Sequence, residues 1–387
     1  MKFSSTEIEA IRSTPTAEVI ARQGDYETIL MRLKEHNHLT ELVTKAKEEF
    51  GERISEPWLT EADWEMLAVL GAFDRTTLLH SIGVYEIAAR KVRENLIGPD
   101  GTVRNIEQLI AAEGVSMPVF LHACLFHDIG KIEVPYEVLM NQLTESEWEA
   151  CLERALDSTD RNSILRKLNL NPEETHTTET VTVTLNEQWL RPISVVPARI
   201  AITEAELAAL IERGYTGEET LAEIIASHET YSAHILSAQG YHIEAELAGH
   251  HHNLHREKLR YPQSTEALRI SAVTLGENAI GLLHAADVEE ALTSAHRSYK
   301  QSLSLLHSLD ILVDHARHHQ LDTHLAYSWI RSELHGTSDT TTETVGLIDS
   351  FSGSSEDDPE ALQELTYLND INAFLAEVEH ELLANRT

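Results

Sequence analysis

The chain has 387 residues, of which 42% are hydrophobic and 24% are charged, so it can fold around one large core or two ordinary ones. Its 64 acidic and 30 basic side chains give a formal net charge of −34, which disfavours binding to nucleic-acid polymers and to anionic membranes. Its two cysteines, Cys124 and Cys151, lack a CxxC spacing, which argues against a disulfide framework, and no stretch is apolar enough to cross a membrane, so a cytoplasmic protein is expected.

Residues 1–70 have the spacing of amphipathic helices, because apolar side chains recur every three or four positions, as between Ile29 and Leu33. Thr60 and Asp63 resemble the side-chain pair that opens a helix. No pattern typical of catalysis stands out in this segment. We therefore expect an N-terminal helical segment that packs against the rest of the chain or binds a protein partner, such as a second copy in a homodimer.

Three further helices are predicted next. The first carries His80 on its inward apolar stripe and ends near Asn95. A turn over residues 97–103 separates it from a central helix that starts near Val115. Another helix opens at Thr144, which has a glutamate three residues later.

Residues 155–218 are expected to form an insertion that contains a small β element. Within it, residues 176–185 alternate apolar side chains with threonines, which is typical of a strand. Residues 192–202 also resemble a strand with prolines at its margins. The insertion would serve as a lid, a regulatory module or a surface excursion.

After the insertion, helical spacing returns. One predicted helix spans residues 224–235 and carries His228 on its apolar face, and a second runs from about His242 to His252. A third carries Asp287. The sequence therefore predicts that these polar side chains come from separate helices.

The C-terminal part is predicted to contain helices over residues 301–335, an acidic linker at 350–359 and an amphipathic helix from Leu362 to Leu383. The predicted fold is mostly α-helical, with a β-containing insertion. The predicted domains are an N-terminal segment (1–70), a central domain (71–335) and a C-terminal linker and helix (336–387).

Residues 121–135, LHACLFHDIGKIEVP, place polar groups inside an apolar run. His127 and Asp128 offer a nitrogen and a carboxylate from adjacent positions, and the two carboxylate oxygens allow Asp128 to bridge two metal ions. Lys131 follows one turn later and could direct a positive charge at whatever the metals hold. Because bare burial of charged groups costs several kcal/mol, such a motif requires partners from elsewhere in the chain.

Candidate partners are histidines and an aspartate on the predicted apolar stripes, which is how helical bundles build dinuclear sites. A lone histidine on an apolar face is more often an ordinary core residue, and the three tandem histidines could end a helix in solvent. The joint occurrence of these residues favours a metal site. The candidates are His80, His127, Asp128, His228, the run His250-His251-His252, and Asp287.

This ordered series resembles the HD superfamily of metal-dependent phosphohydrolases, and more closely its HD-GYP branch. The resemblance covers roughly residues 74–335 and implies an HD-domain helical bundle. The matching residues are His80, His127-Asp128-Ile129-Gly130-Lys131, Leu143-Thr144 with Glu147-Trp148, His228, the run 250–252, Asp287, Ala291-Leu292-Thr293-Ser294, and Arg297-Ser298-Tyr299-Lys300.

The resemblance implies a signalling phosphodiesterase that holds two divalent transition metals, iron or manganese, and hydrolyses a cyclic dinucleotide, above all cyclic di-GMP, through a metal-bound hydroxide. Asp128 and Lys131 would be catalytic. The implied substrate contacts are Lys131, Tyr261, Arg297 and Lys300. The implied metal ligands are His80, His127, Asp128, His228, His251, His252 and Asp287, with His250-His251 as the alternative pair.

Two alternatives remain from the sequence. The segment NLHREKLRYP keeps only Tyr261-Pro262 of the family's glycine-rich GYP motif, which favours a phosphohydrolase that acts on another nucleotide. The acidic helical ends favour a non-catalytic scaffold that binds metal. Thr76 stands where a glutamate would help to hold a third metal, so two metals are expected.

Overall fold

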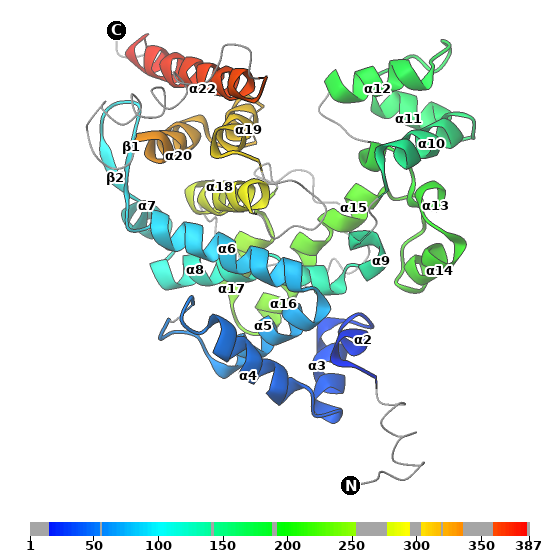
Figure 1. Cartoon of the computed structure of the whole chain (residues 1–387), viewed down its shortest axis with the longest axis horizontal. Coiled ribbons are helices and arrows are strands. Elements are labelled where there is room, and N and C mark those ends of the chain that lie inside the picture. Colours follow the sequence, from blue (N-terminus) through cyan, green and yellow to red (C-terminus); the bar gives the residue numbers. More distant parts are fainter. Residues whose placement is uncertain are drawn as a thin grey trace. The chain divides into compact units, whose positions relative to one another are not determined.

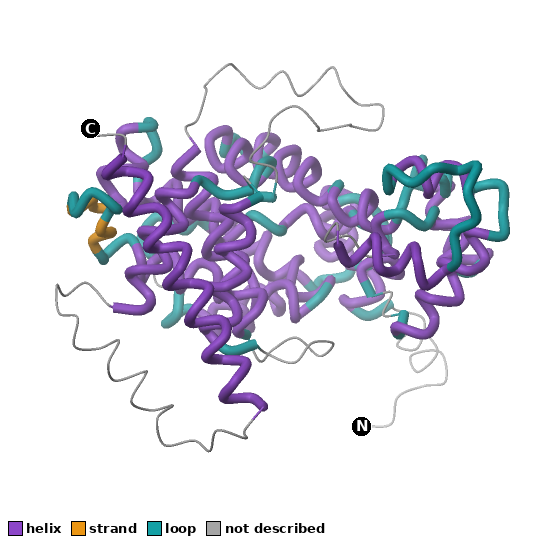
Figure 2. The backbone as a smooth tube through the Cα atoms, turned by 90° about the horizontal axis from the view of Figure 1, so that it is seen from above, coloured by secondary structure: helices purple, strands orange, loops and turns teal. Residues whose placement is uncertain are grey.

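The computed structural model describes residues 15–54, 56–140, 143–187, 192–252, 277–294, 303–318, 320–335 and 359–384. Helices make up nearly all of the regular structure in these ranges, as Figure 1 and Figure 2 show. The sole sheet among the described residues is a two-stranded hairpin. The prediction of a mostly α-helical protein is therefore confirmed.

The chain divides into two compact units. The first comprises Met1–Ala21, Glu27–Ile129 and Glu229–Thr387, and the second Arg22–Tyr26 and Gly130–His228. Apart from Arg22–Tyr26, the described part of the predicted N-terminal segment thus shares a unit with the helices that directly follow it.

The helices of the first unit come from both ends of the chain. Among the described residues they are α2 (Ala17–Ala21), α3 (Tyr26–Glu35), α4 (Leu39–Phe50), α5 (Glu61–Phe73), α6 (Arg75–Lys91), α7 (Ile106–Ala112), α8 (Met117–Phe126), α16 (His228–Ala238), α17 (His242–Ala248), α18 (Glu277–Thr293), α19 (Leu305–Arg317), α20 (Thr323–His335) and α22 (Pro359–Ala384).

The second unit is built from shorter helices. They are η1 (Ile129–Glu133), α9 (Tyr136–Leu139), α10 (Glu145–Leu156), α11 (Arg161–Lys167), α12 (Thr178–Glu187), η2 (Pro192–Ser194), α13 (Ala198–Ala201), α14 (Glu204–Glu212) and α15 (Leu221–Ala226), where η marks a 3-10 helix.

Side-chain caps fix where several of these helices begin. At α5 the hydroxyl of Thr60 accepts from the backbone N–H of Asp63, while the Asp63 carboxylate accepts from the backbone of Thr60. Thr144 and Glu147 form the same reciprocal pair at α10. Asp74 caps α6 by accepting from two backbone N–H groups of its first turn. Each cap satisfies donors that have no partner inside the helix, so these starts follow from local sequence.

The core of the first unit surrounds α8, in which every residue from Phe120 to Phe126 is buried. α8 packs against α6 and α17, and α6 packs against α18. A helix that is apolar on all sides must be enclosed by others, so the residues that follow α8 start inside the protein. No single helix of the described chain is long and apolar enough to span a membrane; α7 and the segment Met117–Glu133 pass that test only as a pair bent by 93°.

The predicted strands of the insertion are wrong. Residues Thr178–Glu187 form α12, and the second expected strand is replaced by η2 and α13. In α12, Val181 and Leu185 are buried while Val183, halfway between them, is 51% exposed. A spacing of four residues fits two strand periods and also one helical turn, so the alternation did not distinguish the two structures.

The observed hairpin lies where a turn was predicted. β1 (Asn95–Ile97) pairs antiparallel with β2 (Val103–Asn105), with Leu96 opposite Arg104. Residues 98–102 connect the strands, and Gly101 adopts a positive φ of 75°, which a residue without Cβ accommodates freely. The predicted turn is therefore real but shorter, with a strand on either side.

Of two predicted helices, one is interrupted and the other ends earlier than expected. The helix over 224–235 is broken at Ser227, so α15 ends at Ala226 and α16 begins at His228. α17 ends at Ala248, with Gly249 as its C-cap, and the tandem histidines follow in a turn. A Cβ on Gly249 would lie 3.1 Å from the Cβ of Ala233, so glycine allows the end of α17 to approach α16 closely.

Candidate metal centre

The predicted ligands lie at or near the ends of helices as well as within them. His80 lies in α6 and Asp287 in α18, whereas His127 and Asp128 directly follow α8. The pair His251-His252 follows α17. All of these residues except His252 are buried.

A first group consists of His80, His127 and Asp287, whose candidate ligand atoms all lie within 4.8 Å of one another. His80 Nε2 lies 2.9 Å and His127 Nε2 3.7 Å from Asp287 Oδ1. Two donors that share one ion at about 2.1 Å lie roughly 3.0–3.4 Å apart. The spacing of these atoms therefore suits a common metal ion.

Asp128 lies among the histidines, and its two oxygens face different rings. Its Oδ2 lies 3.4 Å from the Nε2 atoms of both His80 and His127. Its Oδ1 lies 3.9 Å from His251 Nε2. His127, Asp128 and His251 also form a group of the kind that could hold a metal ion.

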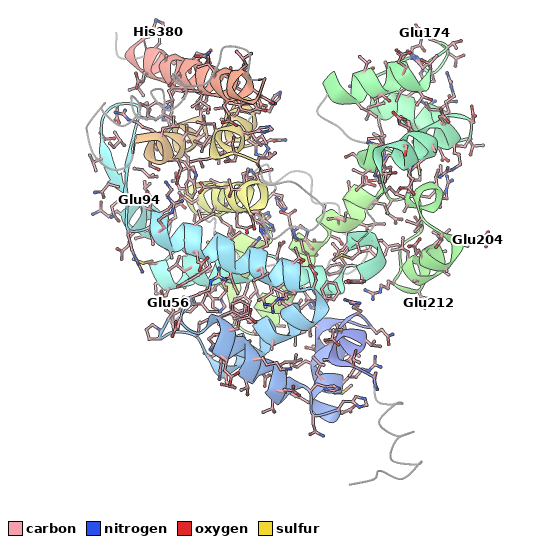
Figure 3. The ribbon with its side chains drawn as sticks, viewed as in Figure 1. Glu56, Glu94, Glu174, Glu204, Glu212 and His380 are labelled. Carbon is pink, nitrogen blue, oxygen red and sulfur yellow. The ribbon has the colours of Figure 1, made fainter. Side chains whose placement is uncertain are left out.

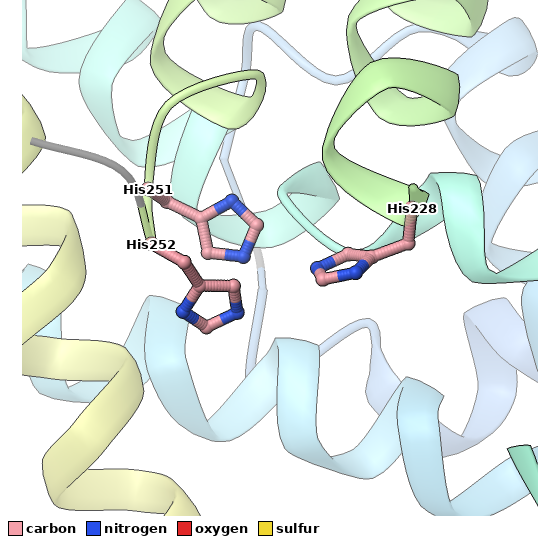
Figure 4. A group of neighbouring side chains, drawn as sticks. All are labelled: His228, His251 and His252. Carbon is pink, nitrogen blue, oxygen red and sulfur yellow. The ribbon is translucent and has the colours of Figure 1, made fainter. Parts of the chain in front are cut away.

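A further group contains His228, His251 and His252 (Figure 4). His228 is the first residue of α16, and the other residues of that helix belong to the first unit. His252 Nδ1 lies 3.6 Å from Asp287 Oδ2, and the His252 side chain is 42% exposed. The cluster is thus buried at His127 and His251 and reaches solvent at His252.

Three of the histidines are oriented in the same way. Each donates from Nδ1 to the carbonyl oxygen three residues earlier: His127 to Cys124 at 2.8 Å, His228 to Ile225 at 2.7 Å and His251 to Ala248 at 2.6 Å. These carbonyls lie in the last turns of α8, α15 and α17, where they have no partner within the helix. These hydrogen bonds give the carbonyl oxygens at the helix ends a partner. They also leave the Nε2 lone pair of each ring available to a metal ion.

His127 Nε2 supplies a test of whether this site suits a metal. The atom is fully buried and makes no hydrogen bond within the described part of the chain. Buried polar atoms without a partner are rare in proteins, because each costs free energy. A metal ion beside the carboxylates of Asp128 and Asp287 would give this nitrogen a partner, so the residues present fit a cation.

The pKa values of His127 and Asp287 are shifted by burial and by the opposite charges beside them. Burial lowers the pKa of His127, but the carboxylates of Asp128 and Asp287 outweigh it and raise the pKa to about 10. Burial raises the pKa of Asp287, but the rings of His127 and His80 hold it well below its usual range. A proton on His127 compensates the negative charge that a divalent cation would otherwise compensate, so proton and metal compete there.

Several residues that support the cluster were not predicted. The buried Glu290, one turn beyond Asp287 on α18, accepts a hydrogen bond from His80 Nδ1. Ser232 on α16 donates to the backbone oxygen of His127 at 2.6 Å. Glu229 and His284 contact the backbone of the tandem histidines. Glu290 and His284 had a signal in the sequence, since each lies three residues from Asp287 and therefore on the same helix face.

The remaining predicted site residues have different outcomes. Lys131 lies in η1, which begins directly after Asp128, and its side chain is half-buried. Its role as a phosphate contact stays a prediction. His250 belongs to none of the metal-type groups found among the described residues, which contain His251 and His252 instead. Tyr261, Arg297 and Lys300 lie outside the described residues.

His122, which the sequence left outside the ligand set, belongs to a separate buried network. Its Nε2 lies 3.1 Å from Asp63 Oδ1, which also accepts from the hydroxyl of Tyr241 at 2.8 Å. This network ties α5 and α8 to Tyr241, the residue directly before α17. Figure 3 shows how densely side chains fill the spaces between the helices of the first unit.

Comparison with known proteins adds no relationship: no family model, no curated protein and no solved structure matches the chain. What the protein can bind must therefore be judged from its own side chains. They form buried groups of histidine and aspartate that could hold a metal ion.

Proposed function

We propose that the protein is a metal-dependent phosphodiesterase that holds two divalent transition metals, iron or manganese. The observation that carries this proposal is the position of Asp128, whose Oδ2 faces His80 and His127 at 3.4 Å while Oδ1 faces His251 at 3.9 Å. A carboxylate with each oxygen turned to a different histidine suits a bridge between two ions. Imidazole and carboxylate ligands without thiolate favour iron or manganese over a structural zinc site.

The ligands divide into two sets around that bridge. Asp287 is near both sets, since Oδ1 approaches His80 and Oδ2 approaches His252. Under this proposal Asp128 would be shared, His80, His127 and Asp287 would hold one ion, and His228, His251 and His252 would hold the other.

Two ions at such a site would polarise a phosphate group and activate a water molecule for attack on phosphorus. The chain's own contribution is to fix the ligands in a buried setting, where electrostatic interactions are stronger than in water. Lys131, Arg297 and Lys300 are proposed to neutralise phosphate oxygens, and Tyr261 to contact the substrate. Such local positive charge is needed because the protein as a whole carries a formal charge of −34.

The proposed substrate is a cyclic dinucleotide, with cyclic di-GMP as the first compound to test. The support for it is the resemblance of the ordered motif from His80 to Lys300 to HD-GYP proteins. A second candidate is a different nucleotide, which the missing glycines before Tyr261 favour. A non-catalytic metal-binding scaffold is the third.

The test is metal quantification after anaerobic purification, followed by incubation with Mn²⁺ or Fe²⁺ and a nucleotide panel. We expect close to two metals per chain and hydrolysis of cyclic di-GMP. In Asp128→Ala the loss of the shared ligand should lower turnover by at least about 100-fold, from the range seen for groups that act at the reacting centre.

Each other outcome has a distinct meaning. Unchanged turnover in Asp128→Ala would overturn the proposed mechanism. Turnover of a non-cyclic nucleotide alone would favour the second candidate, and bound metal without turnover of any nucleotide in the panel would favour the scaffold. Glu244→Ala is a suitable control, because Glu244 is a buried carboxylate on α17 near His122 and belongs to none of the metal-type groups.

A further inference from the structure

We propose that Glu229 and His284 are positioning residues that clamp the peptide group between His251 and His252. The proposal rests on the metal centre proposed above, and on no particular substrate. Neither residue has a ligand role in that centre. Both act on backbone atoms, so a comparison of ligand side chains alone does not reveal them.

The clamp has one side chain on each polar atom of the same peptide group. The backbone N–H of His252 donates to Glu229 Oε1 at 2.8 Å. The backbone oxygen of His251 accepts from His284 Nδ1 at 2.8 Å. Glu229 is 1% and His284 5% exposed, so water does not compete effectively for either bond.

This peptide group needs such support because it lies beyond the end of α17. The helix stops at Ala248, and the tandem histidines are in the turn that follows. In a turn no repeating hydrogen-bond ladder fixes the peptide plane, yet that plane sets the direction of both side chains. The two rings lie with their centroids 4.0 Å apart, so a small rotation would move both Nε2 atoms.

The two clamping residues come from rigid and separate elements. Glu229 lies in the first turn of α16, and its carboxylate gives a charge-assisted bond. His284 lies in α18, one turn before Asp287. Its Nε2 lies 3.1 Å from His315 Nδ1 on α19. With the Nδ1 proton directed at His251, His284 Nε2 is an acceptor, and His315 completes the arrangement by donating to it.

The test measures Co²⁺ binding and the visible absorption spectrum of the Co²⁺-loaded full chain. Glu229→Met and His284→Leu keep side-chain volume but remove the bonds. We expect each to weaken Co²⁺ binding by about 10- to 100-fold, the usual effect of losing an outer partner of a metal ligand, and to shift the absorption bands. Glu229→Gln still accepts and His284→Asn still donates, so both should restore the affinity to within about threefold and the spectrum of the unaltered protein.

Glu244→Met is the matched control, because it removes another buried glutamate that contacts His122 instead of the tandem histidines. It should leave the spectrum unchanged. If Glu229→Met and His284→Leu bind Co²⁺ with unaltered affinity and spectrum, or if Gln and Asn restore nothing, the clamp is wrong. If the unaltered protein binds no Co²⁺, the metal centre itself is wrong. Should Glu229→Met or His284→Leu not fold, the Gln and Asn variants decide, since the clamp requires both to keep the unaltered spectrum.

Discussion

At the scale of single residues, Gly83 determines whether Glu290 can reach His80. A Cβ built on Gly83 would lie 2.6 Å from Glu290 Cγ and 2.7 Å from its Oε1. Glu290 is the acceptor for His80 Nδ1 and so orients the Nε2 atom that faces Asp128 and Asp287. Gly83 thus helps to align His80, a predicted ligand on the same helix, because it leaves room for the side chain of Glu290.

Gly83→Ala is expected to displace Glu290 and thereby weaken Mn²⁺ binding by about 10-fold, because the outer partner of a ligand is lost. Overpacking should also cost about 1–3 kcal/mol of unfolding free energy. Calorimetric titration and urea unfolding measure the two effects.

Gly281→Ala provides the matched comparison on α18. Its added Cβ would lie 2.6 Å from Leu325 Cδ2, the end of an apolar side chain on α20. This variant should lose stability without losing Mn²⁺ affinity. Equal Mn²⁺ affinity in both variants would contradict the role assigned to Gly83.

At the scale of elements, α19 packs against α22 and places two carboxylates, Asp310 of α19 and Asp370 of α22, close to each other. Burial, followed by the nearby charge of Asp370, raises the pKa of Asp310 to about 7. Arg317 donates to Asp370 at 2.8 Å, which compensates one of the two acids. An aspartate in an unfolded chain has a pKa of about 3.9. Between these two values the folded protein holds a proton that the unfolded chain has released.

The contribution of Asp310 to the free energy of unfolding should therefore be greatest below about pH 4. It should decline as the pH rises towards about 7, because the unfolded state binds fewer protons than the folded state in that window. Asp310→Asn should remove this decline and raise the unfolding free energy at pH 8 by roughly 1–2 kcal/mol, allowing for partial screening of a half-buried group.

Urea unfolding at pH 5 and pH 8 measures the effect of Asp310→Asn. Glu381→Gln, which removes an exposed carboxylate of α22, serves as the control for the change in net charge. The assignment fails if Asp310→Asn and Glu381→Gln change the pH dependence equally.

At the scale of the whole molecule, the proposed metal centre joins residues that are far apart in sequence. Its ligands extend from His80 to Asp287, so an ion would cross-link elements that the chain brings together only on folding. A ligand that binds the folded state alone stabilises it in proportion to the logarithm of its concentration.

Mn²⁺ at 100 times its dissociation constant should therefore raise the unfolding free energy by about 2.7 kcal/mol. For a cooperative unit of about 300 to 400 residues that corresponds to a rise in Tm of roughly 3–5 °C. Thermal unfolding followed by circular dichroism measures it, and EDTA should reverse the rise. A Tm that is insensitive to Mn²⁺ in the unaltered protein, or an equal rise in Asp128→Ala, would count against the centre.

The sequence by itself determined the helical class and most of the cluster. Thr60 and Thr144 predicted helix starts correctly, because a cap needs only residues within one turn. The apolar neighbours of His80 and His127 indicated burial for the same local reason. The seven predicted metal ligands all fall in the metal-type groups of the structure.

Only the tertiary structure decided the features that depend on distant contacts. Val181 and Leu185 are spaced so that strand and helix both fit, and packing selected the helix. Glu229 and His284 bind backbone atoms 23 and 33 residues away, and backbone atoms leave no mark in the sequence. Side-chain periodicity records which face is buried, whereas the partner that a buried polar group meets is set by how the helices come together.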